Sequence, residues 1–549
     1  MKMKWLSAIL ALILMLSMPV AFAKDDVPEV MPPTGNLDFD DAITRELTVK
    51  VDGAEMKVTQ YEDVYIPEPS IDDQRVSIYV PEGATADSPI VLCVNNSGWM
   101  ANGYSARTKV AKDDPENVQE YVSDSDDDKV GAILARNFVL VSYGCRSRGN
   151  QAVDGVYDGH SPATITDTKA VIRYLRLNAG KLPAGDPERI IITGTSGGGA
   201  LSTVIAASGN SADYFPSLYA IGAAGVEQAE DGSYASTIDD SVYAVIAYCP
   251  ITDLPNADAA YEWTYGASRA ALEGIDFNTN PEKDAIINYC ADAGTVNPDA
   301  TEALTAMYAE YVNALNLTLD DGAALTAENL KDAIAGLMQD EIAESIEEIG
   351  IEQMRADLAA MNTGDYADWL VIEDDGSFTY DVDKHLTAVA HNNKLKVVCA
   401  FSNRGLPWSN TNEDTLFGAP DAEYAAFEAY SWDNDAVEGN GCGLDDTGLT
   451  WAEYMETEAG QALKLQMRMT NAVEYLNDDD GDKAPNWYVR YGMIDRDSSF
   501  ALETILRYSI ANNADITNSS FEFAWLQPHK GDYDVTEAYA WLDGVLAGE

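Results

Sequence analysis

Hydrophobic and polar residues follow one another in a pattern that predicts a parallel sheet covered by helices. Short, continuous apolar runs rich in β-branched residues indicate buried strands, and longer runs with helical spacing indicate amphipathic helices. Strand-like and helix-like runs alternate, which is typical of a mostly parallel sheet flanked by helices, an α/β fold. The strand-like runs are 49–51, 58–66, 76–80, 90–94, 138–143, 190–192, 242–248, 487–494 and 521–526, and the helix-like runs are 163–177, 200–207, 498–510 and 533–546.

The middle of the chain breaks this alternation. Residues 252–469 are rich in Ala, Glu and Leu, and they predict a large, mainly helical insertion. Such an insertion between sheet strands usually forms a lid over the edge of the sheet. The sheet is then divided into a first part, 24–251, and a second part, 470–549. Within the insertion we expect helices at 303–315, 327–337 and 342–361 and a short β-like run at 395–401.

The first 23 residues have the features of a signal peptide. Lys2 and Lys4 precede an apolar run at 5–18, and small residues at 21–23 provide a cleavage site. We expect cleavage after Ala23 and export or secretion of the mature chain. The alternative is an uncleaved anchor, although the apolar run is short for a membrane-spanning helix.

Charge and cysteine content limit the partners and cofactors. The formal net charge of −58 opposes binding to nucleic acid and to anionic membranes. Six cysteines in an exported chain can be disulfides or buried thiols, and no C-x-x-C pair suggests zinc. The acidic loop 478–482 could bind calcium, but its glycine does not match the EF-hand spacing. The sequence therefore predicts neither a metal nor a cofactor, and it gives no indication of the oligomeric state.

Residues 189–207 combine a strand, a sharp turn and a helix around the sequence G-T-S-G-G. This is the G-x-S-x-G nucleophile elbow in the context that the motif requires, with Ser196 at its apex. Glycine at 194 and 198 allows the strand and helix to approach closely. A Gly/Ser-rich turn without chemistry is the alternative. The elbow predicts an α/β-hydrolase in which Ser196 is the nucleophile.

A nucleophilic serine needs a base and an acid that orients the base. In α/β-hydrolases these follow in the order Ser, acid, His. Of the four histidines, His529 alone follows the last predicted strand. The preceding strand leaves Asp495 or Asp497 as the acid, and position favours Asp495. By position the oxyanion hole would take N–H groups from Gly197 and from the Asn96 region, although Asn96 could also lie in an ordinary turn.

Three segments resemble the bacterial tannase (tannin acylhydrolase) family, subtype B. They are 161–202, A-Y-C-P-I-T-D-L at 247–254 and Y-G-M-I-D-R-D-S-S-F at 491–500, and the resemblance extends over about 140–529. It implies an α/β-hydrolase with a large lid, with Asp495 in the triad and Asp497 on a galloyl hydroxyl.

The resemblance also implies a lysine and a glutamate on the galloyl hydroxyls. The surroundings of Lys396 and Glu413 match those of the family, with Lys394 as a near competitor. Two carboxylates and an ammonium group can hold three adjacent phenols by charge-assisted hydrogen bonds. The sequence departs from the family in a longer segment between 396 and 413 and in Asn403-Arg404, which replaces an acidic-small pair.

Together these observations predict a secreted serine esterase that acts on small phenolic esters, such as gallate esters and hydrolysable tannins. A feruloyl or broad-specificity carboxylesterase would keep the triad and lose the galloyl contacts. A non-catalytic binding protein on the same scaffold is disfavoured because the serine, the acid and the base are all present. A peptidase is disfavoured because no propeller repeat precedes the elbow.

Overall fold

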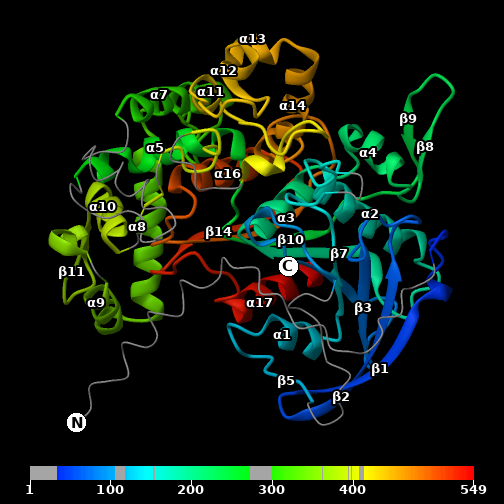
Figure 1. The fold of residues 1–549 in the computed structure, drawn as a ribbon. Helices are drawn as coiled ribbons and strands as arrows, with labels where there is room; N and C mark the ends of the chain where they lie inside the picture. The colour runs from blue at the N-terminus through cyan, green and yellow to red at the C-terminus, as the bar shows by residue number, and fades with distance from the viewer. Residues whose placement is uncertain are drawn as a thin grey trace, which may run out of the picture. The chain divides into compact units, whose positions relative to one another are not determined.

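A ten-stranded, mostly parallel β-sheet forms the centre of the structure (Figure 1). The computed structural model describes residues 34–104, 118–151, 155–271, 298–361, 363–392, 395–396, 398–406 and 413–548, and the predicted signal peptide lies outside these ranges. The strands across the sheet are β14 (Asn518–Ala524), β13 (Asn486–Gly492), β10 (Ala244–Tyr248), β7 (Asp186–Thr195), β4 (Pro89–Val94), β6 (Val139–Tyr143), β3 (Arg75–Pro81), β2 (Ala54–Val64), β1 (Ile43–Val51) and β5 (Glu120–Tyr121). The strands from β14 to β6 pair in parallel, and β6, β3, β2 and β1 pair antiparallel.

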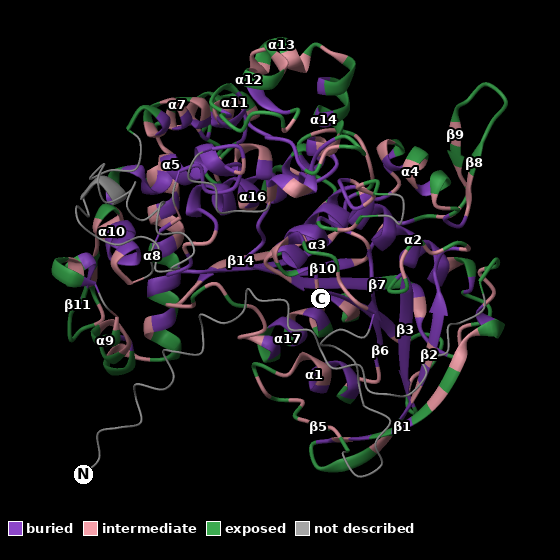
Figure 2. Ribbon diagram, in the orientation of Figure 1, coloured by how far each residue is buried: buried purple, intermediate pink, exposed green. Residues whose placement is uncertain are grey.

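Helices cover both faces of this sheet, as the sequence predicts. Figure 1 shows α1 (Lys129–Ala135) and α17 (Val535–Ala547) on one face. On the other lie α2 (Ala163–Leu177), α3 (Gly197–Ala207) and α16 (Phe500–Asn512). Each face has its own buried apolar core, and strands β4, β6, β10 and β13 are buried along their length (Figure 2). The α/β architecture expected from the alternating pattern is confirmed.

Between β10 and β13 the chain leaves the sheet and forms a mainly helical insertion. Within the described residues, its larger elements are α5 (Leu254–Ala271), α7 (Pro298–Leu315), α8 (Leu330–Glu348), α9 (Ile351–Ala360), β11 (Leu370–Ile372), β12 (Phe378–Tyr380), α10 (Val382–Asn392), η6 (Glu413–Leu416), α11 (Ala429–Asp433), α12 (Gly443–Thr447), α13 (Trp451–Met455), α14 (Glu458–Arg468) and α15 (Ala472–Leu476). Residues 33–549 form one compact unit, so the insertion packs on the sheet. The boundaries at 252 and 469 stay a prediction.

Two expectations for the insertion were wrong in detail. The predicted break between 337 and 342 is absent, because α8 runs through it with Met338 and Ile342 buried on one face. Helices α8 and α9 are instead separated at Gly350, whose φ of +82° is readily adopted by glycine. The run 395–401 is not a strand in its described residues, and the N–H groups of Lys396 and Phe401 bond to side chains instead. The N–H of Phe401 donates to Asp258 Oδ1 at 2.7 Å, for example.

The loops at the carboxyl ends of the parallel strands carry most of the predicted site. Ser196 follows β7, Asp495 follows β13 and His529 follows β14, while Asn96 follows β4. Parallel strands bring these ends to the same edge of the sheet, where α/β proteins bind ligands. Among the described helices, none is long and apolar enough to span a membrane.

Candidate active site

The turn between β7 and α3 holds Ser196 in a strained backbone conformation. Ser196 has φ +61° and ψ −126°, which costs about 1–3 kcal/mol for a residue other than glycine. Its N–H donates to the carbonyl of Tyr248 at 2.9 Å. Its own carbonyl accepts from the N–H of Ala200 at 2.9 Å and of Ile251 at 3.2 Å. These bonds fix the turn, and they leave the hydroxyl at the N-terminal end of α3.

Ser196, His529 and Asp495 form a continuous chain of hydrogen bonds. His529 Nε2 lies 2.8 Å from Ser196 Oγ, and His529 Nδ1 lies 2.7 Å from Asp495 Oδ2. The backbone N–H of Asp497 donates to the other carboxylate oxygen of Asp495 at 2.8 Å. The Asp495 side chain is fully buried, whereas that of His529 is 22% exposed. The structure thus brings the predicted nucleophile, base and acid together, and the side chain of Asp497 takes no part in this chain.

The environment of His529 sets its affinity for a proton. Burial lowers the pKa of His529, but the charge of Asp495 and its hydrogen bond to the imidazole act in the opposite direction. Asp497 also raises this pKa, and Lys396 lowers it. The net result is a pKa above the ordinary value of histidine. A general base must be unprotonated, so any reaction that uses His529 will lose rate as the pH falls through this raised pKa.

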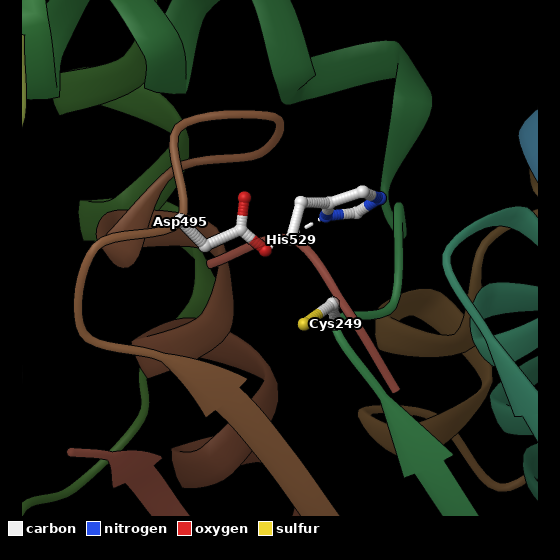
Figure 3. A group of neighbouring side chains, drawn as sticks. All are labelled: Cys249, Asp495 and His529. Carbon is white, nitrogen blue, oxygen red and sulfur yellow. Dashed lines mark hydrogen bonds and ion pairs between the residues drawn. The ribbon is translucent and has the colours of Figure 1, made fainter. Parts of the chain in front are cut away.

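The loop that carries His529 packs tightly against the neighbouring strand ends. A Cβ atom on Gly531 would lie only 1.9 Å from Thr195 Oγ1, beside the nucleophile. The thiol of Cys249, just after β10, donates to the carbonyl of Lys530 at 3.1 Å. Figure 3 shows the Cys249 side chain beside the Asp495–His529 pair. The segment directly after His529 is therefore held by contacts with two neighbouring strand ends.

The two segments predicted for the oxyanion hole lie in contact. Gly197 is the first residue of α3, where N–H groups have no partner within the helix. A Cβ atom on Gly197 would lie 2.1 Å from the Trp99 nitrogen and 2.7 Å from the Asn96 oxygen. The side-chain amide of Asn96 donates to the carbonyl of Met100 at 2.8 Å. Asn96 therefore stabilises the turn after β4 while its backbone lies beside the nucleophile.

Lys396, Glu413 and Asp497 form a charged group beside the triad. Burial lowers the pKa of Lys396, and the negative charges of Asp497 and Glu413 oppose this shift. Burial alone would raise the pKa of Asp497, but the positive charges of Arg496, His529 and Lys396 lower it to about 2. Lys396 Nζ also lies 3.9 Å from the centroid of the Phe401 ring. The competing Lys394 lies outside the described residues.

Comparisons with known proteins identify structures with a similar fold. The BD-FAE family profile matches residues 76–289, and no curated protein matches the chain. The structure of a tannase from Lactobacillus plantarum aligns with a TM-score of 0.69 and 25% identity, covering 92% of this chain and 98% of the other. A tannase from Fusobacterium nucleatum aligns with a TM-score of 0.69 and 26% identity, covering 93% and 99%. A tannin acyl hydrolase solved with ethyl gallate gives a TM-score of 0.69 and 26% identity, covering 92% and 98%.

The chain has an α/β-hydrolase fold that is similar to those of tannases. Its reaction class is carboxylic-ester hydrolysis. The agreement extends over the insertion as well as the sheet, because more than nine-tenths of the chain aligns. The resemblance found in the sequence is confirmed.

The site also contains Arg148, which the sequence interpretation missed. Arg148 lies in the loop after β6, and its Nη2 is 3.7 Å from Glu413 Oε1. A Cβ atom on Gly98, in the turn after β4, would lie 3.1 Å from the same nitrogen. Arg148 is 6% exposed, and its Nε and Nη1 have no hydrogen-bond partner. Its position at the end of a parallel strand was the signal that could have revealed it.

Two tyrosines of α5 connect the insertion to the loop after β13 that carries Asp495. The hydroxyl of Tyr265 donates to the carbonyl of Asp495 at 3.1 Å, and that of Tyr261 donates to the carbonyl of Arg496 at 2.9 Å. Tyr261 also accepts a hydrogen bond of 3.0 Å from the backbone N–H of Lys396. The Tyr261 side chain therefore joins the loop after β13 to the segment that carries Lys396. No sequence motif indicated this role, because it depends on the packing of α5.

The other three histidines, all within the described ranges, lie in different surroundings. The ring nitrogens of His160 contact the carbonyls of Gly418 and Glu423. His385 stacks on Trp369 with centroids 4.2 Å apart, and burial lowers its pKa to about 3. His391 contacts Tyr366 by its ring. None of these interactions resembles the serine and carboxylate contacts of His529.

Proposed function

We propose that this protein hydrolyses galloyl esters through an acyl-enzyme formed on Ser196. The observation that carries the proposal is the hydrogen-bonded chain Ser196–His529–Asp495 beside the charged group of Lys396, Glu413 and Asp497. The tannin acyl hydrolase solved with ethyl gallate supports a galloyl substrate. Small phenolic esters such as gallate esters and hydrolysable tannins are therefore the proposed substrate class.

In the proposed reaction His529, oriented by Asp495, accepts the proton of Ser196 as the hydroxyl attacks the ester carbonyl. The N–H of Gly197 and one from the Asn96 segment stabilise the oxyanion, each contributing about 3 kcal/mol in sites of this kind. The protonated His529 then gives its proton to the departing alcohol. Water, activated by the same base, releases the free acid from Ser196.

The charged group beside the triad fits the hydroxyls of a galloyl ring. An ammonium group and two carboxylates can hold adjacent phenols through charge-assisted hydrogen bonds, which are stronger than neutral ones. The ion pair with Arg148 at 3.7 Å would keep Glu413 oriented for this purpose. Because these groups come from both the insertion and the sheet edge, we also propose that the insertion acts as a lid that completes the acyl site.

The test is hydrolysis of methyl gallate, methyl ferulate and p-nitrophenyl butyrate by the wild type and Ser196→Ala. We expect a strong preference for methyl gallate and a loss of at least about 10⁴-fold in kcat in the variant. A preference for methyl ferulate, or none among the three esters, would replace the galloyl proposal with a feruloyl or general carboxylesterase. Near-wild-type hydrolysis by a folded Ser196→Ala variant would disprove the mechanism.

We propose export for the same chain, on the basis of residues 1–23. The basic start, the apolar run and the small residues at 21–23 support cleavage after Ala23. The mass of the protein recovered from the culture medium of an expressing bacterium tests this. A mature chain that begins at Lys24 is the expected result, and a cell-associated chain retaining Met1 would contradict it.

A further inference from the structure

Cys249 lies beside the triad but has no part in the proposed ester hydrolysis. It follows β10, is fully buried, and has a φ of +44°. Five of the six cysteines lie in the described ranges, and all five are buried thiols without a disulfide. Of these five, Cys249 donates a hydrogen bond to the carbonyl of Lys530, which directly follows His529.

Three different ligand types converge at this point. The Cys249 sulfur, a carboxylate oxygen of Asp495 and a ring nitrogen of His529 lie within 4.8 Å of one another (Figure 3). They come from loops after β10, β13 and β14, which the parallel sheet places side by side. In a tetrahedral zinc site with bonds of about 2.0–2.3 Å, ligand atoms are separated by roughly 3.3–3.8 Å. The separation of the three atoms is therefore close to that of ligands on a shared ion.

We propose that Cys249, Asp495 and His529 form an inhibitory site for a thiophilic divalent cation, with Zn²⁺ and Cd²⁺ as the representative ions. Thiolate and imidazole are the ligands that such ions prefer, and a carboxylate completes a common three-ligand set. The fourth position would hold water. The inference uses the same side chains as the proposed triad, so it extends the proposed function by a means of switching it off.

Inhibition follows from the position of one proton. In the active arrangement neutral His529 carries its proton on Nδ1, which donates to Asp495, and Nε2 is free to accept the proton of Ser196. A cation bound to Nδ1 uses the lone pair there, so the imidazole proton must move to Nε2. The base then faces Ser196 with a donor instead of an acceptor. The thiol of Cys249 loses its proton to solvent, so one proton is released for each ion bound.

A second group of similar composition provides a control. Among the described residues, Asp258, Cys399 and Glu428 also place three possible ligand atoms within 4.8 Å of one another. Both oxygens of Asp258 accept backbone hydrogen bonds, from Phe401 at 2.7 Å and Ser402 at 2.9 Å. This group contains no histidine and none of the proposed catalytic residues. Cys399→Ser therefore tests whether any cation effect arises from thiols in general.

The experiment titrates the mature enzyme, Cys249→Ser and Cys399→Ser with Cd²⁺ and with Zn²⁺. Ester hydrolysis is measured for each variant relative to its own metal-free rate, and Cd²⁺ binding is followed by the ultraviolet cadmium–thiolate charge-transfer band. We expect reversible inhibition of the wild type that a chelator removes and that strengthens with rising pH. Cys249→Ser should require at least about tenfold more cation and lose the band from this site, whereas Cys399→Ser should respond like the wild type.

Further variants separate the metal site from the proposed esterase activity. Ser196→Ala should bind Cd²⁺ with the wild-type band although it does not hydrolyse ester, and His529→Gln should bind it more weakly. Binding by Ser196→Ala thus reports on the site even if gallate esters prove not to be substrates. The proposal is overturned if Cys249→Ser is as sensitive as the wild type, or if inhibition appears without a thiolate band. Should Cys249→Ser fail to fold, an undiminished band in His529→Gln would overturn it equally.

Discussion

The triad and the charged group beside it are built in different ways. Ser196, Asp495 and His529 each follow a strand of one sheet, and hydrogen bonds of 2.7 and 2.8 Å join them. Lys396 and Glu413 lie in the insertion, where the charge of Glu413 acts on Lys396, and Arg148 Nη2 lies 3.7 Å from Glu413. The triad thus comes from the strand ends of one sheet, whereas the charged group joins long side chains of the insertion to Asp497 at a strand end.

This difference separates the chemical step from the choice of substrate. In the proposed mechanism a change in the triad would alter a reaction common to every ester, because all esters share the carbonyl that Ser196 would attack. A change in the charged group would alter binding of phenolic hydroxyls, which simple alkyl esters lack. Substitutions in the triad and in the charged group should therefore differ in the size of their effect on activity. They should also differ in how that effect depends on the ester.

The largest effect is expected for Asp495→Asn. The amide would hold His529 in the wrong tautomer, and kcat should fall about 10⁴-fold for methyl gallate and p-nitrophenyl butyrate alike. Steady-state kinetics on both esters measure this. Asp497→Asn is the matched control, because it should affect the butyrate far less. If Asp497→Asn lost more p-nitrophenyl butyrate hydrolysis than Asp495→Asn, Asp497 and not Asp495 would be the acid that orients His529.

A smaller and selective effect is expected for Lys396→Met. Methionine keeps most of the buried stem and removes the charge. Loss of a charge-assisted hydrogen bond should lower kcat/KM for methyl gallate by about 10- to 150-fold, and p-nitrophenyl butyrate should be hydrolysed almost as before. Equal losses on both esters would show that Lys396 supports the triad and not the phenolic ring.

Arg148→Met should have a still weaker effect on the same ester. Without the 3.7 Å ion pair, Glu413 loses orientation, and KM for methyl gallate should rise about two- to fivefold with kcat retained. The melting temperature should not fall, because Arg148 Nε and Nη1 are buried without partners. Arg148→Lys should restore part of the affinity. A drop in melting temperature with unchanged KM would instead make Arg148 a structural residue.

The smallest effects are expected in the pH dependence of kcat/KM for p-nitrophenyl butyrate. Asp497 raises the pKa of His529 and Lys396 lowers it. Because the base works unprotonated, Asp497→Asn should move the acid limb to lower pH, and Lys396→Met should move it to higher pH. Shifts in the same direction in both variants would contradict the arrangement of charges around the base.

The sequence predicts the sheet and the triad because both depend on local patterns. Apolar runs fix the strands, the glycines around Ser196 fix the elbow, and chain order leaves His529 as the only histidine past the last strand. The parallel topology then brings the strand ends together. No long-range information was needed for this part of the site.

The insertion resisted prediction because its contacts are distant in sequence. The run 395–401 has a strand-like composition, but the N–H of Phe401 bonds to Asp258 of α5. Tyr261 joins Lys396 to the loop of Asp495 across more than a hundred residues. Arg148 is 265 positions from Glu413 along the chain, yet the two form an ion pair. Such side-chain partners follow from tertiary packing and leave no periodic signal.

Gly531 has a consequence for how enzymes of this kind can diversify. A side chain at this position would collide with Thr195, and the base would be pushed away from the nucleophile. Substitutions that enlarge residue 531 are therefore expected to be excluded as the site evolves. If the substrate contacts lie in the insertion as proposed, ester specificity can change there while residue 531 stays glycine.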